Sequence, residues 1–387
     1  MDNSLELLTK PVLSLCMIVK NERENLPRCL TSAQPYVDEI VVVDTGSQDG
    51  TPEIAIQFGA KVEYFEWCDD FAAARNYCLS QASGDWILVL DADEELVVNS
   101  ENFLEQINGR PEFLMFSLIR TEANDQEGMT PLHTIRLFPN IPEIKYVNRF
   151  HEQLIYQGEV ISEQLVGQLE SLQILHYGYL KEQVKQKNIN RNIPIVERTR
   201  QEEGLSLMLL YCLAGMYADT QQTEKAQKCY SEAFDRLLPN LTDGTAPDEL
   251  AFVPSLIFTL GVQSLQQEDY ETARLLCQRG LEWCPTYPPL NYLAGATIRA
   301  LGFPLGAVAY FENCIRLGRE GNYYKGEPFE QSYMTIYPAY DMGCTYIDLE
   351  RLQEALAAFE LALSFDANFT AAQEKIDKIK QFLDTQA

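Results

Sequence analysis

The first part of the chain alternates short apolar runs with polar stretches of helical periodicity. Apolar runs rich in β-branched residues predict strands at Val12–Val19, Ile40–Val43 and Trp86–Leu90. The stretches between them predict helices at 24–33, 51–58 and 71–82. Strand, helix and strand at this spacing indicate βαβ units and a mostly parallel, buried sheet. Ligands of such sheets bind at the carboxyl ends of the strands, so the polar residues that follow each run are candidates for a site.

Residues 100–200 carry weaker patterns. Two apolar runs, Phe113–Ile119 and Ile135–Phe138, predict strands, and the polar stretch 181–200 predicts a connecting helix. One of its basic residues, Lys181, Lys185 or Arg191, could neutralise an anionic ligand, although a solvated helix face explains most of them.

From Gly204 onward the pattern is helical only, and it repeats. Small residues mark one register of the repeat: Ala226, Ala273, Ala307 and Ala355. Ala273 and Ala307 are 34 residues apart, which is the tetratricopeptide period. The longer intervals on either side predict insertions at 240–253 and 322–335, and 370–383 predicts a capping helix. A helical array without true repeats is the alternative interpretation.

The change from alternating strands and helices to helices alone predicts two domains. The first spans 1–200, with a ligand-binding part at 11–98, a second half at 99–180 and a helical connector at 181–204. The second is an all-α tetratricopeptide-repeat domain at 205–387.

The charge balance restricts the partners. There are 57 acidic and 30 basic side chains, a formal charge of -27. This charge repels nucleic acids and anionic membranes, and it would also repel a diphosphate unless a cation offset it. The N-terminus lacks the pattern of a signal peptide, no apolar run reaches the roughly 20 residues of a membrane span, and the ten cysteines form no CxxC pair. We therefore expect a cytoplasmic protein with no nucleic-acid partner and no transmembrane segment.

The segment GDWILVLDADEEL is the strongest chemical signal. In an extended chain Asp91 and Asp93 project to the same side. Two adjacent carboxylates repel each other unless a cation lies between them, and oxygen ligands suit Mg²⁺ or Mn²⁺. Taken alone, the pair is more typical of a solvated turn at a strand end than of a metal site.

Three more segments accompany it in order: LSLCMIVKNERENLPRCL (13–30), DEIVVVDTGSQDGT (38–51) and FAAARNYCL (71–79). With these four segments, residues 11–95 resemble the family-2 glycosyltransferases of the GT-A fold. The resemblance implies an α/β GT-A domain with a Rossmann-like, mostly parallel sheet and a nucleotide-sugar donor. It also implies that the donor contacts Ile18, Lys20, Asn21, Asp44, Arg75 and Asp91, and that Asp93 and Asp91 hold Mn²⁺ or Mg²⁺. Structural alternatives exist, because Asp44 could cap a turn and Arg75 could pair with Asp69 or Asp70.

The three histidines all lie between 131 and 178. His151-Glu152 stands in YVNRFHEQLIY, and Glu152 is the candidate general base, with His151 as the alternative. Together with RLF at 136–138, HEQL resembles a subset of family-2 enzymes that carry C-terminal tetratricopeptides. His176 matches a histidine that often completes the metal shell in GT-A enzymes, and a packed strand histidine is the other interpretation.

We therefore hypothesise a metal-dependent transfer of a sugar from a nucleoside-diphosphate donor, with a UDP-sugar as the expected donor. The family resemblance implies that the transfer inverts the anomeric carbon. The repeats suggest a protein or peptide acceptor or a homodimer, while a lipid-linked or other glycan acceptor stays open. A binding scaffold with an inactive GT-A domain and a nucleotidyltransferase are the rival functions. The latter usually has a Gly-rich loop where this chain has LysAsnGluArgGluAsn.

Overall fold

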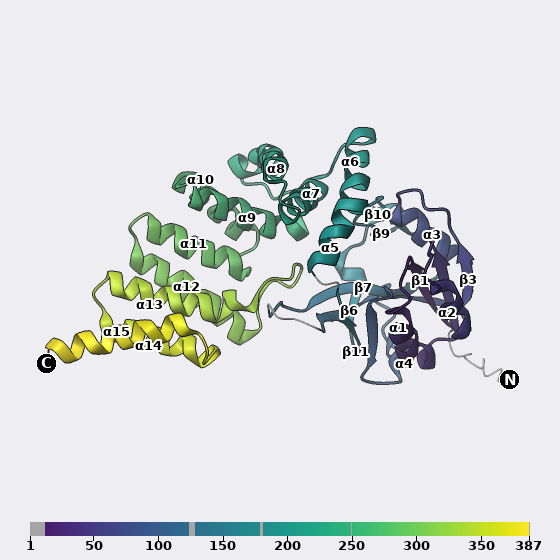
Figure 1. The fold of residues 1–387 in the computed structure, drawn as a ribbon, viewed down its shortest axis with the longest axis horizontal. Helices are drawn as coiled ribbons and strands as arrows, with labels where there is room; N and C mark the ends of the chain where they lie inside the picture. The colour runs from purple at the N-terminus through teal and green to yellow at the C-terminus, as the bar shows by residue number, and fades with distance from the viewer. Residues whose placement is uncertain (1–11, 124–127, 179–180, 249, 387) are drawn as a thin grey trace, which may run out of the picture. The chain divides into compact units, whose positions relative to one another are not determined.

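The computed structural model describes residues 12–123, 128–178, 181–248 and 250–386 (Figure 1). The chain divides into two compact units. The first comprises 1–125 and 131–205, and the second comprises 126–130 and 206–387. Residues 128–130 therefore belong to the second unit, although they lie between two strands of the first.

The first unit is built on an eight-stranded sheet in the order β3-β2-β1-β4-β7-β6-β11-β5. Its strands are β1 (Leu13–Val19), β2 (Glu39–Asp44), β3 (Lys61–Tyr64), β4 (Trp86–Val89), β5 (Glu94–Val98), β6 (Met115–Glu122), β7 (Leu132–Pro139) and β11 (Val166–His176). The pairs β1–β2, β1–β4, β2–β3 and β6–β11 are parallel, and the other three are antiparallel. A separate three-stranded sheet contains β8 (Ile144–Val147), β9 (Gln153–Tyr156) and β10 (Glu159–Val160). The predicted GT-A-type, mostly parallel sheet is thus confirmed.

Both faces of β1, β2 and β4 are buried, which explains their continuous apolar sequence. On one face, Leu15 and Met17 of β1 pack in a core with residues of α1 (Leu26–Ala33) and α2 (Thr51–Gln57). On the other face, Cys16 packs in a second core with Cys78 of α3 (Phe71–Gln81). Figure 1 shows α3 on the opposite side of the sheet from α1 and α2. The carboxyl ends of β1, β2 and β4 consequently lie together at one edge.

The sheet curls, so that its last strand returns to the first helix. Leu96 N of β5 donates a hydrogen bond to Ser32 Oγ of α1 at 2.9 Å. The turn at 91–93 joins β4 to β5, although these strands are not neighbours in the sheet. This turn corrects one step of the sequence argument, because Asp91 and Asp93 are not on extended chain.

The connector is interrupted rather than continuous. It contains α5 (Lys181–Lys187), a π-helical turn (Asn188–Asn192) and α6 (Ile193–Glu202). The remaining helix of this unit, α4 (Phe103–Asn108), follows β5. Pro194 lies in the first turn of α6 and has no N–H to continue the ladder of hydrogen bonds. A wide turn immediately before the proline is the expected accommodation, and such turns often occur at functional sites.

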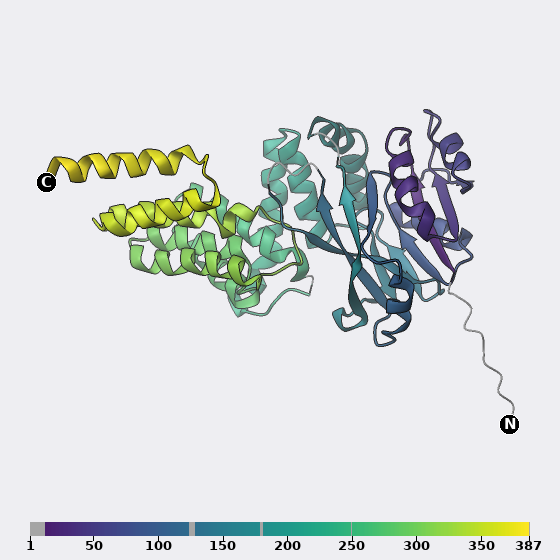
Figure 2. The ribbon, with the colours of Figure 1, turned by 90° about the horizontal axis from the view of Figure 1, so that it is seen from below.

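The second unit is helical, as the sequence predicted (Figures 1 and 2). Among its described residues, α-helices form four consecutive pairs followed by a final helix. The helices are α7 (Leu207–Asp219), α8 (Thr223–Asp243), α9 (Val253–Gln266), α10 (Tyr270–Trp283), α11 (Pro288–Ala300), α12 (Pro304–Glu320), α13 (Ile336–Asp348), α14 (Leu352–Phe365) and α15 (Thr370–Gln386). The four register alanines lie on the second helices and are at most 4% exposed. At Gly295 a Cβ would lie 2.6 Å from the ring of Phe311, so the small residues permit the close approach of paired helices.

Candidate active site

Asp44 lies at the carboxyl end of β2 and is 2% exposed. Its Oδ1 accepts hydrogen bonds from the backbone N–H groups of Gly46 and Ser47, each at 2.9 Å. Its Oδ2 is buried and accepts no hydrogen bond from the residues that the structure describes. Asp44 therefore caps the turn with one carboxylate oxygen, as the structural alternative expected. Its other oxygen is a buried acceptor without a donor, which is unusual in a folded protein.

The loop after β1 is tied to the loop after β2 by Asn21. Its backbone adopts a positive φ of 54°, its N–H donates to Ser47 Oγ at 2.8 Å, and its Oδ1 accepts from Gln48 N at 2.8 Å. Lys20 is exposed beside it, and Ile18 lines a small cavity with Arg75 and Tyr146. The predicted nucleoside side of the site is thus brought together, with Asn21 holding the loops in place.

Asp91 is paired with two arginines. Arg75 Nη2 lies 3.0 Å from Asp91 Oδ1, and Arg136 Nη2 lies 3.3 Å from Asp91 Oδ2. Burial alone would raise the pKa of Asp91, but attraction to Arg75 and Arg136 outweighs it and holds the pKa far below its usual range. The sequence suggested a metal ion because two adjacent carboxylates, Asp91 and Asp93, would otherwise repel each other. Two guanidinium groups already neutralise the Asp91 carboxylate, so its charge does not require a metal ion.

Glu152 shares Arg75 with Asp91. Its Oε1 accepts a hydrogen bond from Arg75 Nε at 2.6 Å, and its side chain is 16% exposed. The alternative pairing of Arg75 with Asp69 or Asp70 is wrong, since Asp69 pairs with Arg198 and Asp70 caps α3. Glu152 is thus held in an ion pair with the same arginine that binds Asp91.

His151 is exposed and adopts a positive φ of 57° in the loop between β8 and β9. Its ring lies 6.4 Å from that of Phe150, which in turn contacts Phe71. A left-handed conformation at a residue other than glycine indicates that the surrounding loop dictates the backbone here.

Asp93 faces the end of β11 rather than Asp91. Its Oδ2 lies 3.5 Å from His176 Nε2, while His176 Nδ1 lies 2.7 Å from Glu122 Oε2. Burial would lower the pKa of His176, but hydrogen bonds to Asp93 and Glu122 raise it to about 9. Arg120 Nη2 lies 2.9 Å from Glu122 Oε1 and completes this group.

The fit to a metal ion is partial. Two expected ligands, Asp93 and His176, are adjacent, and a carboxylate with an imidazole is an acceptable donor pair for Mn²⁺. The third, Asp91, points toward Arg75 and Arg136 instead. Across the described ranges, no three histidine, cysteine, aspartate or glutamate side chains converge in an arrangement that could hold a metal.

Sequence reasoning missed Glu94 and Arg136 as site residues. Glu94 is 1% exposed, accepts Asp91 N at 2.8 Å through Oε2 and pairs with Arg136 at 2.6 Å through Oε1. Burial raises the pKa of Glu94 despite the attraction of Arg136. The acidic run DADEE contained a signal, because a third carboxylate after an apolar strand needs a cationic partner, but nothing in the sequence identified Arg136 as that partner.

Lys187 was also missed. Its Nζ lies 3.9 Å from Glu22 Oε1, beside the end of β1, and burial lowers its pKa. Arg191, on the π-helical turn, lies with its guanidinium carbon 5.0 Å from the centre of the Phe71 ring. The side chain of Lys181 lies outside the described residues.

A curled α/β sheet with ionised side chains at its strand ends, followed by helical repeats, defines a GT-A-type domain joined to a tetratricopeptide array. Residues 14–157 match the family model Glycosyl transferase family 2, and residues 339–369 match Tetratricopeptide repeat. The chain thus carries a family 2 glycosyltransferase domain and at least one tetratricopeptide repeat.

Similar proteins include one named for tetratricopeptide (TPR) repeats and one named as a glycosyltransferase. A TPR repeat-containing protein of Synechococcus elongatus is 43% identical over 180 residues, covering 45% of this chain and 44% of that protein. The SPbeta prophage-derived glycosyltransferase SunS of Bacillus subtilis is 26% identical over 192 residues, covering 48% and 44%. The chain therefore spans less than half the length of these two relatives.

Among solved structures, glucosyl-3-phosphoglycerate synthase from Mycobacterium tuberculosis, in complex with Mn²⁺, uridine-diphosphate and glucosyl-3-phosphoglycerate, aligns with a TM-score of 0.33. The identity is 14%, and the alignment covers 49% of this chain and 80% of that chain. Within the described residues, no helix is long and apolar enough to cross a bilayer.

Proposed function

We propose that this chain transfers a sugar from a nucleoside-diphosphate donor, a UDP-sugar, to an acceptor, with inversion at the anomeric carbon. The observation that carries the proposal is the buried, unpartnered Oδ2 of Asp44 at a strand end of a family 2 domain. A buried acceptor without a donor costs free energy, and the N–H or O–H of a bound nucleoside would remove that cost.

The roles of the nucleotide-sugar residues follow from where they lie. Asp44 binds the base or ribose, and Ile18, Lys20 and Asn21, at the end of the neighbouring strand β1, contact the same nucleoside. Asp91 faces the ribose, held by the arginines that fix its orientation. Lys187 and Arg191 approach from the connector and offset the negative charge of the diphosphate.

Asp93 and His176 are the residues that would hold Mn²⁺ or Mg²⁺, with Asp91 as a third ligand if it exchanges its arginine partners. A divalent cation at this position would neutralise charge on the leaving diphosphate. Glu122, bonded to the other nitrogen of His176, orients the imidazole toward Asp93.

Glu152 accepts the proton of the acceptor as its nucleophilic atom attacks C1 of the sugar. Arg75 Nε binds Glu152 Oε1, which leaves Oε2 as the atom that takes the proton. His151, next in the chain and exposed, is the alternative base. The acceptor we propose is a protein or peptide recruited by the repeats; a homodimer is the alternative use of the array.

The donor half of the proposal is tested by thermal shift with a panel of nucleotide sugars, with and without Mn²⁺. A ligand at a hundred times its Kd stabilises by about 2.7 kcal/mol, so a shift of several degrees is expected with a UDP-sugar. Asp93→Ala should abolish the Mn²⁺-dependent part, while Asp235→Ala, an exposed aspartate on α8, should leave it intact. No shift with any nucleotide sugar would contradict the proposal and favour a scaffold.

The base is tested separately by measuring donor hydrolysis and transfer. Glu152→Gln preserves size and the contact with Arg75, so donor binding should persist while turnover falls by about 10²–10⁴-fold. Retained turnover in Glu152→Gln with loss in His151→Ala would transfer the role to His151.

A further inference from the structure

Tyr177 directly follows His176 and is fixed by three separate contacts. Its backbone N–H donates to the carbonyl oxygen of Asp93 at 2.9 Å. Its hydroxyl donates to Glu95 Oε2 at 2.6 Å. The guanidinium carbon of Arg28, from α1, lies 3.6 Å from the centre of its ring. The main chain, the hydroxyl and one ring face of this half-buried residue thus each have their own partner.

Arg28 is a fixed partner for the tyrosine ring. Its Nη2 donates to Asn25 Oδ1 at 3.2 Å, and its Nε is buried without an acceptor among the residues that the structure describes. A guanidinium group over the face of a tyrosine ring is attracted to that face, and the attraction grows when water is excluded. The contact between Arg28 and Tyr177 therefore links α1 to the end of β11.

The main-chain contact of Tyr177 continues the pairing of β5 with β11. In this antiparallel pair, His176 lies opposite Glu94, the first residue of β5. The bond from Tyr177 N to Asp93 O extends the pairing by one residue on each strand. Because Tyr177 adjoins His176 in the chain, this bond determines how closely the main chains of Asp93 and His176 approach each other.

The approach of these two main chains determines where two candidate cation ligands lie. Asp93 Oδ2 and His176 Nε2 are 3.5 Å apart. Ligands of one metal ion must be held within about 0.5 Å of their working positions, and the groups that orient them influence the affinity for the ion. A shift of the Tyr177 ring or hydroxyl would move His176 relative to Asp93.

We propose that Tyr177, held by Arg28 and Glu95, is a positioning residue that keeps Asp93 and His176 at the separation needed to hold a divalent cation. This inference rests on the proposed function, because it concerns the cation that would neutralise the leaving diphosphate. It adds a residue of α1 and a residue of β5 to those that determine cation affinity, and both act through Tyr177.

The test measures Mn²⁺ binding to the full chain by electron paramagnetic resonance, with UDP present and no acceptor. The part of the binding that Asp93→Ala abolishes defines the site. Glu95→Ala and Glu95→Gln remove the same charge, but only glutamine keeps an acceptor for the Tyr177 hydroxyl. The Kd for Mn²⁺ should be about fivefold higher in Glu95→Ala than in Glu95→Gln, as expected for the loss of one hydrogen bond.

Variants of Tyr177 and Arg28 test the other contacts. In a Tyr177→Phe background, which lacks the hydroxyl, the difference between Glu95→Ala and Glu95→Gln should vanish. Arg28→Met keeps a long side chain without the charge and should raise the Kd by at least about threefold. The matched control is Arg351→Met, because the guanidinium carbon of Arg351 lies 5.1 Å from the centre of the Tyr346 ring in the repeat unit. That variant should leave the Kd unchanged.

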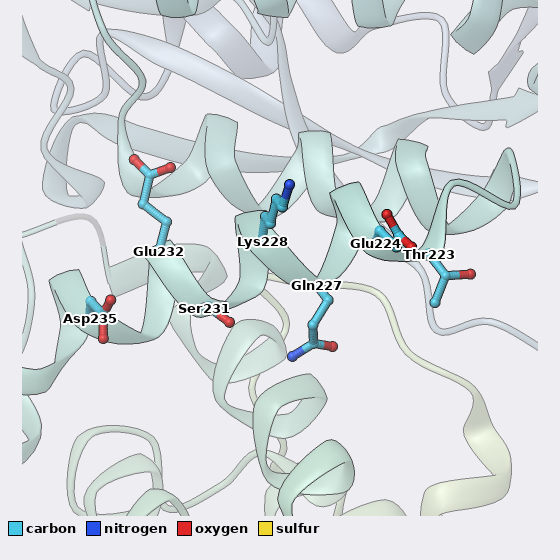
Figure 3. Close-up of a pocket in the computed structure, with 7 residues that line it drawn as sticks. All are labelled: Thr223, Glu224, Gln227, Lys228, Ser231, Glu232 and Asp235. Atoms are coloured by element: carbon cyan, nitrogen blue, oxygen red, sulfur yellow. The ribbon is translucent and has the colours of Figure 1, made fainter.

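A second control addresses weak collection of Mn²⁺ by a chain with a formal charge of -27. A hollow along one face of α8 carries three carboxylates, those of Glu224, Glu232 and Asp235. Figure 3 shows them spaced along the helix rather than converging on one point. Glu232 is paired there with Arg236 at 2.6 Å. Glu232→Gln removes one negative charge from this hollow and should leave the Kd unchanged.

Equal Mn²⁺ affinities of Glu95→Ala and Glu95→Gln would overturn the proposal, as would an equal loss in Arg351→Met or Glu232→Gln. A difference between the two Glu95 variants in melting temperature alone would assign Tyr177 to the fold and overturn it too. If Asp93→Ala fails to weaken Mn²⁺ binding, the proposed cation site fails and this inference fails with it. If Asp93→Ala weakens binding while the Glu95 variants stay equal, this inference alone fails.

Discussion

Glu327, half-buried in the insertion between α12 and α13, gives a prediction that can be worked through in free energy. Its pKa is raised from the ordinary value of 4.5 to about 7 by burial. A carboxyl whose folded pKa lies above its unfolded pKa binds its proton more tightly in the folded state. Its contribution to stability is therefore fully present below about pH 4.5, declines as the pH rises, and is lost above pH 7. Replacing Glu327 by glutamine removes this decline.

The two pKa values correspond to about 3 kcal/mol between the ends of this range. Water reaches part of the side chain, so an effect of about 1–2 kcal/mol is expected. For a unit of this size, such a change shifts the melting temperature by about 2–8 °C.

The assay is a series of thermal melts between pH 4.5 and 8.5 on the wild-type chain, Glu327→Gln and Glu232→Gln. The melting temperature of Glu327→Gln relative to wild type should rise with pH and level off above pH 7. The corresponding difference for Glu232→Gln, at a half-exposed residue of α8 that is paired with Arg236, should stay flat. A pH-independent difference for Glu327→Gln, or one that falls with pH, would refute the raised pKa of Glu327.

Three other substitutions test the site and the fold. Arg75→Ala leaves the carboxylates of Asp91 and Glu152 without their shared cation. It should lower the free energy of unfolding, measured by urea denaturation, by about 3 kcal/mol. A loss under about 1 kcal/mol, typical of an exposed ion pair, would contradict a structural role for Arg75. Asp44→Asn should weaken nucleotide binding about tenfold by calorimetry while the melting temperature stays nearly constant, and unchanged binding would remove Asp44 from the donor site. Gly84→Ala would place a Cβ 2.5 Å from Ser14 Oγ and 2.8 Å from the carbonyl oxygen of Val12, so it should cost about 1–3 kcal/mol, and an unchanged melting temperature would count against this strand contact.

The elements that sequence predicted best are those with a strong period. The run at 12–19 became β1 at Leu13–Val19, and the helix at 71–82 became α3 at Phe71–Gln81. β3 escaped prediction because its four residues are largely exposed and lack an apolar pattern. The π-helical turn escaped because its cause, Pro194, acts through hydrogen bonds that no apolar period records.

The candidate site divides in the same way. Asp44 and Asp91 could be found because they follow apolar strands, and ligand sites of such sheets lie there. The family resemblance also named Arg75, but its pairing with Asp91 and the part played by Arg136 could not be found, because these arginines approach Asp91 from a helix and from another strand of the sheet. The sequence therefore indicated where charge collects, while the choice between a metal ion and guanidinium groups as its neutralising partner depended on tertiary packing.

Residues 128–130 belong to the repeat unit, although the gene encodes them within the first unit. Met129 forms a β-bridge with Glu330, and Thr130 N donates to Phe329 O at 2.8 Å. The repeat unit thus includes a short segment that lies between β6 and β7 in the chain, well before the first helix of the repeats. A single recombination breakpoint near residue 205 would separate the helices from this edge. We therefore expect that a chimaera that exchanges the repeats keeps these contacts only if it also carries the β6–β7 connection.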